Sequence, residues 1–371
     1  MHDNDNNGEA DFYENFSDET DISFNFHAFN FDLQTDDQGN FYYSKGGNGS
    51  DMALPGAVIR VSSDGSRRDA FSTGFRAPNG MGTLPGGLVT CSDNQGHWMP
   101  ASKISLLKQG GFYGWVQTYS GKDKWAPDGG RIDVSKVIPP KTFDQPLIWM
   151  PQEFDNSSGG QIWVDDARWG PLAGRLLHTS FGKGWLSYLM IQKVDDVHQA
   201  AIVKLPFDFR TGIMRGRVNP KDGQVYVTGL QGWNGGGRIG LLDQGVQRLR
   251  YTGQPMLMVS HCKVESDGLR VHFNFPLDPN SIQGGDSFAA KHWNYVWQAS
   301  YGSEMYSPTT GRIGADSLTL QGVELAPDKR SVKLRYTELR PVHQLQLRVH
   351  VKSADGTPLD EEIYWTIHRL P

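Results

Sequence analysis

The chain begins with oxygen-bearing side chains at the spacing of a calcium-binding loop. Residues 3–14 read DNDNNGEADFYE, which fits the pattern D-x-D-x-N-G-x5-E with a glycine at the sharp turn. Ca²⁺ prefers about six to eight hard oxygen ligands, and this stretch offers them within one short loop. We therefore predict a calcium site formed by Asp3, Asp5, Asn7, Glu9, Asp11 and Glu14. The alternative is a disordered terminus rich in Asn and Asp.

Two arginines separated by one residue form a second candidate site. They lie in the sequence Met214-Arg215-Gly216-Arg217-Val218. If this stretch is extended, Arg215 and Arg217 share one face of a strand. Arginine forks bind carboxylates through two parallel hydrogen bonds, so the pair predicts an anion-binding site. The alternative is the solvated outer face of a strand.

A third group combines polar and aromatic side chains directly after a short apolar run. It consists of Asp93, Asn94, Gln95, His97 and Trp98. Loops that follow strands are where ligands most often meet side chains, so this group predicts the mouth of a binding site.

His27 could act as a general base. A neutral imidazole can take the proton from a hydroxyl group near neutral pH. The residue lies in the sequence Phe24-Asn25-Phe26-His27-Ala28-Phe29, so the alternative is a core histidine packed between Phe26 and Phe29.

A sequence pattern, a glycine turn followed by a short strand, recurs along the chain. We therefore expect β structure to position these residues. The pattern occurs at residues 37–43, 84–90, 172–178 and 221–227. Each unit is too small to bury its own face, and no helical period persists for long. Units repeating at this spacing predict blades of a β-propeller, which we place at residues 15–252 after the loop-like segment 1–14.

The pattern changes after residue 252. Residues 269–275, 331–336 and 344–351 alternate apolar and polar side chains, as half-buried antiparallel strands do. We therefore predict an all-β chain in which a partial propeller of the six-bladed type precedes an immunoglobulin-like sandwich at residues 253–371.

Composition excludes several classes of protein. The 371 residues include 44 glycines and have a net charge of −5, with no block of Lys and Arg, which argues against a nucleic-acid partner. Two cysteines without a C-x-x-C motif exclude thiolate zinc sites and covalent c-type haem within this chain. Neither a membrane-spanning segment nor an apolar signal region is present.

Four stretches together resemble a known family. They are residues 24–29, residues 73–80 (TGFRAPNG), residues 92–115 ending in KQGGFYGW, and residues 214–218 (MRGRV). Residues 27–250 resemble the soluble quinoprotein sugar dehydrogenases. The whole chain resembles their larger bacterial relatives, the membrane-bound dehydrogenase-type and haem-domain-associated propeller proteins.

The resemblance implies roles for individual residues. His27 would be the catalytic base, while Arg76, Lys183, Arg215 and Arg217 would hold pyrroloquinoline quinone (PQQ). Calcium would bind backbone carbonyls near Gly96. Two positions depart from the family pattern: Ala77 replaces an Asn, and His97 replaces a Pro.

The resemblance also implies a function, namely an oxidoreductase that oxidises the CH–OH group of a sugar or polyol. A haem protein would be the electron acceptor, and the parent protein would be periplasmic or extracellular. Because only four blades are recognisable, we expect this chain to be an N-terminally truncated piece. The alternative is a non-catalytic propeller that binds carbohydrate or protein.

Overall fold

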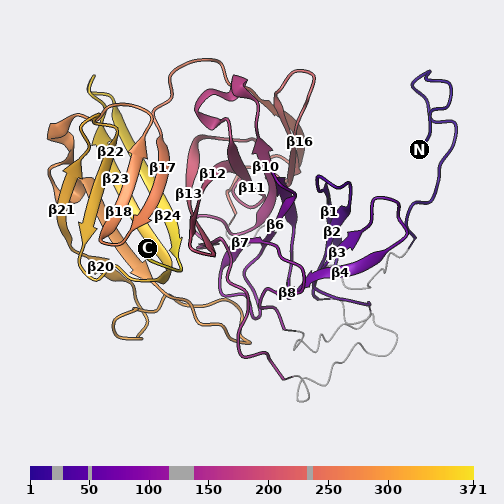
Figure 1. Cartoon of the computed structure of the whole chain (residues 1–371), viewed down its shortest axis with the longest axis horizontal. Coiled ribbons are helices and arrows are strands. Elements are labelled where there is room, and N and C mark those ends of the chain that lie inside the picture. The colour runs from indigo at the N-terminus through magenta and orange to yellow at the C-terminus, as the bar shows by residue number, and fades with distance from the viewer. Residues whose placement is uncertain (19–27, 49–51, 117–137, 232–236) are drawn as a thin grey trace.

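A computed structural model describes residues 1–18, 28–48, 52–116, 138–231 and 237–371 (Figure 1). The prediction of an all-β chain is confirmed, because strands arranged in five sheets make up most of the regular structure. The helices in these ranges are short 3-10 turns: η2 (Ala167–Leu172), η3 (Pro279–Ile282) and η4 (Gly285–Ser287). None of the described helices could cross a membrane.

Four antiparallel sheets form the propeller half of the chain. The first contains β1 (Asn30–Thr35), β2 (Phe41–Lys45), β3 (Ala57–Val61) and β4 (Arg68–Thr73), with β8 (Gly111–Phe112) added in parallel. The second contains β5 (Gly80–Leu84), β6 (Leu88–Asp93), β7 (Ser102–Leu106) and β9 (Ile148–Met150). The third begins with β10 (Ser158–Val164), β11 (Arg175–Ser180), β12 (Trp185–Val194) and β13 (Val197–Asp208). The fourth contains β14 (Arg215–Val218), β15 (Val225–Leu230) and β16 (Gln244–Leu249).

The four recurring glycine turns connect the first and second strands of these four sheets. They join β1 to β2, β5 to β6, β10 to β11 and β14 to β15. Each turn contains a glycine at positive φ, a conformation that costs glycine little because it has no Cβ. The prediction of four blade units is therefore confirmed.

The first strands of the four sheets lie close together. β5 packs against both β1 and β10, and β10 packs against β14. A Cβ added to Gly80 would lie 2.3 Å from the backbone of Gly159 and Gly160, so glycine at position 80 allows the backbones of β5 and β10 to approach. This approach brings the loops of different sheets around one common region.

The C-terminal part is a sandwich of two sheets, which stands on the left in Figure 1. One sheet has the order β17-β18-β22-β21, with β17 (Val259–Glu265), β18 (Gly268–Phe273), β22 (Ser331–Tyr336) and β21 (Leu320–Leu325). The other contains β24 (Pro358–Ile367), β23 (Val342–Lys352), β19 (Phe288–Trp293) and β20 (Asp316–Leu318). Its immunoglobulin-like type remains a prediction.

One sheet crosses the boundary that we placed near residue 253. β13 pairs with β24 through Ala201–Trp365, Ile202–Tyr364 and Val203–Ile363, which makes a single eight-stranded sheet. A common apolar core accompanies it and includes Val203 of β13, Val271 of β18 and Leu347 of β23. The sandwich is thus attached to the third propeller sheet by backbone hydrogen bonds and by shared core packing.

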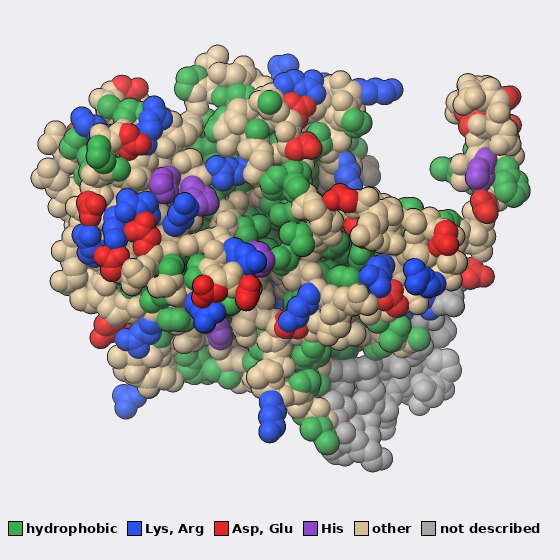
Figure 2. All heavy atoms as spheres, in the orientation of Figure 1, with side chains coloured by type: hydrophobic (Ala, Val, Ile, Leu, Met, Phe, Trp, Pro, Cys, Tyr) green, Lys and Arg blue, Asp and Glu red, His purple; other side chains and the backbone are tan. Residues whose placement is uncertain are grey.

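Charged side chains of both signs lie next to each other on the face shown in Figure 2. On the sandwich, Lys333 contacts the carboxylates of Glu265 and Asp267, and Arg335 contacts Asp267 and Glu324. These strands therefore present a mixed ionic network to the solvent.

Candidate functional site

A cavity of about 440 Å³ lies where loops of the propeller sheets meet a loop of the sandwich, and we call it the Arg76 cavity. It is lined by Phe29, Phe31, Arg76, Ala77, Asn79, Asn94, Gln95, Asn156, Ser157, Phe181, Met214, Leu230, Gln231 and Tyr301. The described lining therefore combines aromatic rings, carboxamides and two hydroxyls with one charged side chain.

Asp93 fixes the loop that carries Arg76. Its carboxylate is fully buried and accepts hydrogen bonds from the backbone N–H groups of Arg76 (2.8 Å), Ala77 (2.7 Å) and Asn94 (2.9 Å). Burial raises the pKa of Asp93, while the positive charge of Lys103 and these hydrogen bonds act in the opposite direction. Asp93, which we predicted to lie at the mouth, instead acts from behind the cavity wall as an anchor.

Arg76 extends along the cavity with its guanidinium group held on two sides. Nη1 donates to the carbonyl oxygen of Gln95 at 3.0 Å, and Cζ lies 5.2 Å from the centre of the Tyr301 ring. A Cβ on Gly96 would come within 1.8 Å of Nε of Arg76, so this contact requires glycine at position 96. Nε of Arg76 is buried and has no hydrogen-bond partner among the described residues.

The sandwich contributes one wall of the cavity through the loop around Tyr301. The N–H of Gly302 donates to the carbonyl of Gly96 at 2.9 Å, and the ring of His97 meets Tyr301 edge to face at 5.7 Å. Trp98 packs against Trp297 with ring centres 5.0 Å apart. His97 and Trp98 therefore join the propeller to the sandwich. Asn94 and Gln95 line the cavity, and their contact with a substrate stays a prediction.

The Gly96 carbonyl accepts hydrogen bonds from the N–H groups of Gly302 at 2.9 Å and Met99 at 3.0 Å. The absence of a side chain at this position allows the close approach of Arg76. The calcium role that the resemblance implied for Gly96 stays a prediction.

A buried polar network supports the opposite wall. The carboxylate of Asp155 is fully buried and contacts Nε2 of His178 at 2.7 Å, while the hydroxyls of Ser158 and Ser180 each donate to it at 2.7 Å. The backbone N–H of Ser157 also donates to Asp155 at 3.2 Å. This network fixes the segment that brings Asn156 and Ser157 to the cavity.

Arg215 and Arg217 do share one face of an extended strand, but both point to a carboxylate of the protein. Nη2 of Arg217 lies 3.0 Å from Oδ1 of Asp32, and Nε of Arg215 lies 3.4 Å from Oδ2. The backbone N–H of Met81 donates to the same carboxylate at 2.8 Å. Asp32 thus connects the first, second and fourth propeller sheets.

The residues predicted to hold PQQ together therefore meet at one cavity only in part. Arg215 reaches the wall indirectly, through a 3.4 Å contact between its Nη1 and the side-chain oxygen of Asn79. Arg217 lines a separate surface hollow with Gln34 and Trp163. Lys183 lies outside the lining, and burial lowers the pKa of its ammonium group. His27 falls outside the described residues, so its predicted role stays a prediction.

No protein family matches the chain, and no curated protein matches it. Among solved structures, the chain is similar to an oxidoreductase of the glucose dehydrogenase type from Thermus thermophilus, with a TM-score of 0.41, 19% identity, and coverage of 58% of this chain and 64% of that one. It is also similar to the PQQ-bound form of an aldose sugar dehydrogenase from Streptomyces coelicolor, with a TM-score of 0.39, 15% identity, and coverage of 60% and 62%. A protein of unknown function from Dyadobacter fermentans aligns over 92% of this chain and 94% of its own, with a TM-score of 0.25 and 12% identity. The chain thus spans less than two thirds of the first two structures.

The described lining does not fit PQQ. This quinone carries three carboxylates and needs several cations, whereas Arg76 is the sole cation among the residues that line the cavity. Arg215 and Arg217 already share Asp32, so they are not available without breaking those ion pairs. The sequence-based prediction of PQQ therefore stays a prediction, and we derive no catalytic step through it.

The N-terminal loop adopts the compact form that its sequence predicts. Carboxylate oxygens of Asp3, Asp5 and Asp11 all lie within 4.8 Å of one another on the exposed segment. The backbone N–H of Gly8 donates to Asp3 at 2.9 Å, which turns the chain at the predicted glycine. Glu14 instead contacts Nε2 of His2 at 3.0 Å.

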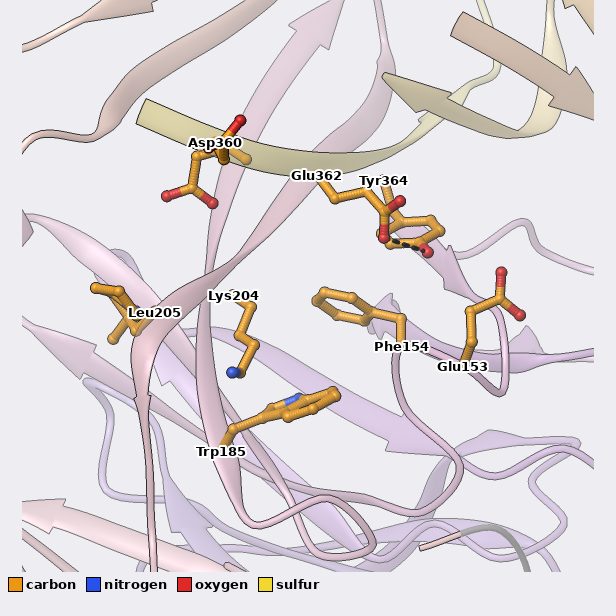
Figure 3. Close-up of a pocket in the computed structure, with 10 residues that line it drawn as sticks. Glu153, Phe154, Trp185, Lys204, Leu205, Asp360, Glu362 and Tyr364 are labelled. Carbon is orange, nitrogen blue, oxygen red and sulfur yellow. Dashed lines mark hydrogen bonds between the residues drawn. The ribbon is translucent and has the colours of Figure 1, made fainter. Parts of the chain in front are cut away.

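A second cavity, of about 330 Å³, lies where the third propeller sheet joins the sandwich (Figure 3). In that view Asp360 and Glu362 lie on β24, with Lys204 and Trp185 across from them. Two of its polar groups have partners, because Glu362 accepts from the Tyr364 hydroxyl at 2.9 Å and Lys204 lies 2.8 Å from Asp208, which is outside the lining. The Arg76 cavity, which has buried polar atoms without partners, is therefore the stronger candidate for ligand binding.

Sequence reasoning did not identify Tyr301 or Phe181 as site residues. Tyr301 lies in the sandwich, and no motif marks it as a neighbour of Arg76. The glycine- and serine-rich stretch at residues 155–160 was a usable signal, because both Asn156 and Ser157 line the cavity.

Proposed function

We propose that the Arg76 cavity binds a sugar or a polyol. Two buried polar atoms of its lining support this, because Nε of Arg76 is a donor and Oε1 of Gln95 is an acceptor, and neither has a hydrogen-bond partner among the described residues. A hydroxyl group can donate and accept at once, so a polyhydroxylated ligand complements both the guanidinium group and the carboxamide.

The shape of the lining supports the same class of ligand. The rings of Phe29, Phe31, Phe181 and Tyr301 offer flat apolar surfaces, and carboxamides lie between them. Small-ligand sites commonly combine aromatic walls with a few polar groups that fix orientation. The volume of about 440 Å³ is in the range of small-molecule sites.

Binding without turnover is the form of this function that the described residues support best, since Arg215 and Arg217 are engaged by Asp32. Oxidation of the bound sugar is the wider proposal that the family resemblance makes, and it depends on His27 and on a quinone. A haem-protein acceptor and a periplasmic or extracellular location belong to that wider proposal.

Tyr301→Ala is expected to weaken binding of an aldose or polyol about five- to tenfold, because the ring that forms one wall is lost. Tyr301→Phe keeps the ring and should bind within about twofold of the parent. Isothermal titration calorimetry with glucose and sorbitol measures both affinities. Tyr13→Ala removes an exposed tyrosine far along the N-terminal segment and is the matched control. Unchanged affinity in Tyr301→Ala would contradict the proposed site.

We also propose that the N-terminal loop binds Ca²⁺ through Asp3, Asp5 and Asp11, whose carboxylates lie together. Calorimetric titration of the full chain with Ca²⁺ is expected to give a saturable heat that is lost in Asp5→Ala, because one of three converging carboxylates is removed. Asp18→Ala, which changes an exposed acid outside the loop, should leave the heat unchanged. The same heat in Asp5→Ala as in the parent would show that this loop is not the site.

A further inference from the structure

We infer that the Arg76 cavity prefers sugar acids, such as uronates and aldonates, and that the guanidinium group of Arg76 binds their carboxylate. This inference rests on the proposed function and narrows the class of its ligand. Three features support it: the charge of the lining, the donors of Arg76, and the neighbouring residues that hold its side chain.

The charge of the lining favours an anion. Among the described residues that line the cavity, Arg76 is the one charged side chain, and none of them carries a carboxylate. The nearby carboxylate of Asp93 is buried behind the wall, where three backbone N–H groups and the positive charge of Lys103 act on it. A ligand carboxylate therefore meets a positive group in the cavity without an acidic side chain beside it in the lining.

The donors of Arg76 match a carboxylate. Nη1 donates to the carbonyl oxygen of Gln95, and Nε is buried against Gly96 without a hydrogen-bond partner among the described residues. Nη2, which lies on the same edge of the guanidinium group as Nε, makes no hydrogen bond with the described residues and is the donor that a ligand can reach. A charge-assisted hydrogen bond from Nη2 to a carboxylate is roughly twice as strong as one to a neutral hydroxyl.

The neighbours of Arg76 fix the plane of that edge before a ligand arrives. The Tyr301 ring centre lies 5.2 Å from Cζ of Arg76. Gly96 packs against Cδ, Nε and Cζ of the same side chain. Asp93 holds the backbone of Arg76 through the 2.8 Å hydrogen bond to its N–H. A side chain that is already ordered loses less conformational entropy on binding, so this arrangement favours selective recognition.

The rest of the lining fits the sugar part of the ligand. The carboxamide of Gln95, whose Oε1 has no partner among the described residues, can accept from a ligand hydroxyl, and Ser157 offers a further hydroxyl contact. Asn94 is less available, because its amide donates to the Ala77 carbonyl and its oxygen accepts from the N–H of Ser158. Arg76 thus provides the preference for an acid, and Gln95 and Ser157 contact the hydroxyl groups of the ligand.

The test is calorimetric titration of the full chain with glucuronate, with glucose and with PQQ, each alone. Glucuronate is expected to bind at least about tenfold more tightly than glucose, because it adds a charge-assisted hydrogen bond to the guanidinium group. In Arg76→Gln the preference should disappear, because the affinity for glucuronate should fall by more than the affinity for glucose and the two should become equal within about threefold. Arg210→Gln, which changes an exposed arginine outside the cavity, is the matched control and should keep the preference. Raising the salt concentration should reduce the preference in the parent and not in Arg76→Gln.

The outcomes separate this inference from the proposed function. Equal binding of glucose and glucuronate would overturn the preference for acids and leave sugar binding in place. A preference for glucuronate that persists in Arg76→Gln would overturn the role of Arg76. Binding of PQQ without binding of either sugar would replace both proposals with a quinone site. If none of the three compounds binds, both proposals fail. A thermal melt of Arg76→Gln close to that of the parent establishes that its altered binding does not come from unfolding.

Discussion

Asp32→Ala is expected to lower the free energy of unfolding by about 2–4 kcal/mol, because the partly buried Arg215 and the backbone N–H of Met81 lose their acceptor, whereas the half-exposed Arg217 can bind water instead. The Asp32 side chain is 1% exposed, and its carboxylate contacts both Arg215 and Arg217. It also accepts a hydrogen bond from the backbone N–H of Met81. Removing it leaves two cations and a backbone donor without their acceptor at the meeting point of three sheets. Alanine would in addition be strained at the φ of 55° that Asp32 adopts.

Denaturant unfolding followed by far-UV circular dichroism and by tryptophan fluorescence measures this loss. Asp32→Asn keeps the shape of the side chain and tolerates positive φ, so it should lose less stability than Asp32→Ala. Asp37→Ala removes an exposed acid from the adjacent turn and should change stability by less than about 0.5 kcal/mol. Equal stability of Asp32→Ala and Asp37→Ala would show that the three-sheet contact contributes nothing.

Asp155→Ala is expected to cost a similar amount, about 3–5 kcal/mol, and to weaken ligand binding as well. The fully buried carboxylate holds His178, Ser158 and Ser180 through contacts of 2.7 Å each. Without it these buried groups lose their common partner, and each unsatisfied group carries a desolvation cost. Because Asp155 also accepts from the N–H of Ser157, the segment that supplies Asn156 and Ser157 to the cavity loses its support.

Two measurements distinguish this effect from a simple loss of packing. Asp155→Asn keeps the volume and one acceptor oxygen, so it should recover part of the stability and part of the affinity for sugar. Asp165→Ala, at a position outside this network, is the control and should behave like the parent. Normal sugar affinity in Asp155→Ala would mean that the network does not position the cavity wall.

The sequence was most informative where the signal is local. Each glycine turn is encoded within a few residues, so the four hairpins and the all-β class could be predicted. The extended Arg-x-Arg pair was predictable for the same reason, because strand geometry alone places Arg215 and Arg217 on one face. Asn94 and Gln95 followed from the position of a polar loop after a strand.

What could not be predicted depends on contacts between distant parts of the chain. Asp32 is a single acidic residue outside any motif. Only the folded chain shows that it forms ion pairs with Arg215 and Arg217, which were expected to hold a cofactor. Tyr301 reaches Arg76 from the sandwich, and its own sequence neighbourhood carries no sign of a ligand. The pairing of β13 with β24 could not be predicted either. The composition of an apolar strand does not indicate whether its partner strand is near or far in sequence.

The pairing of β13 with β24 also has a consequence for how the chain folds as it is synthesised. β10 to β13 can pair as soon as they leave the ribosome, but the free edge of β13 receives its partner only when β24 has been made, after the other strands of the sandwich. During that interval a strand with buried apolar residues such as Ile202 and Val203 presents unpaired backbone groups to other chains. Pairing between segments so far apart is slow, because a long loop must close before the contact forms. Nascent chains interrupted before β24 would therefore be more prone to associate through β13 than the finished protein is.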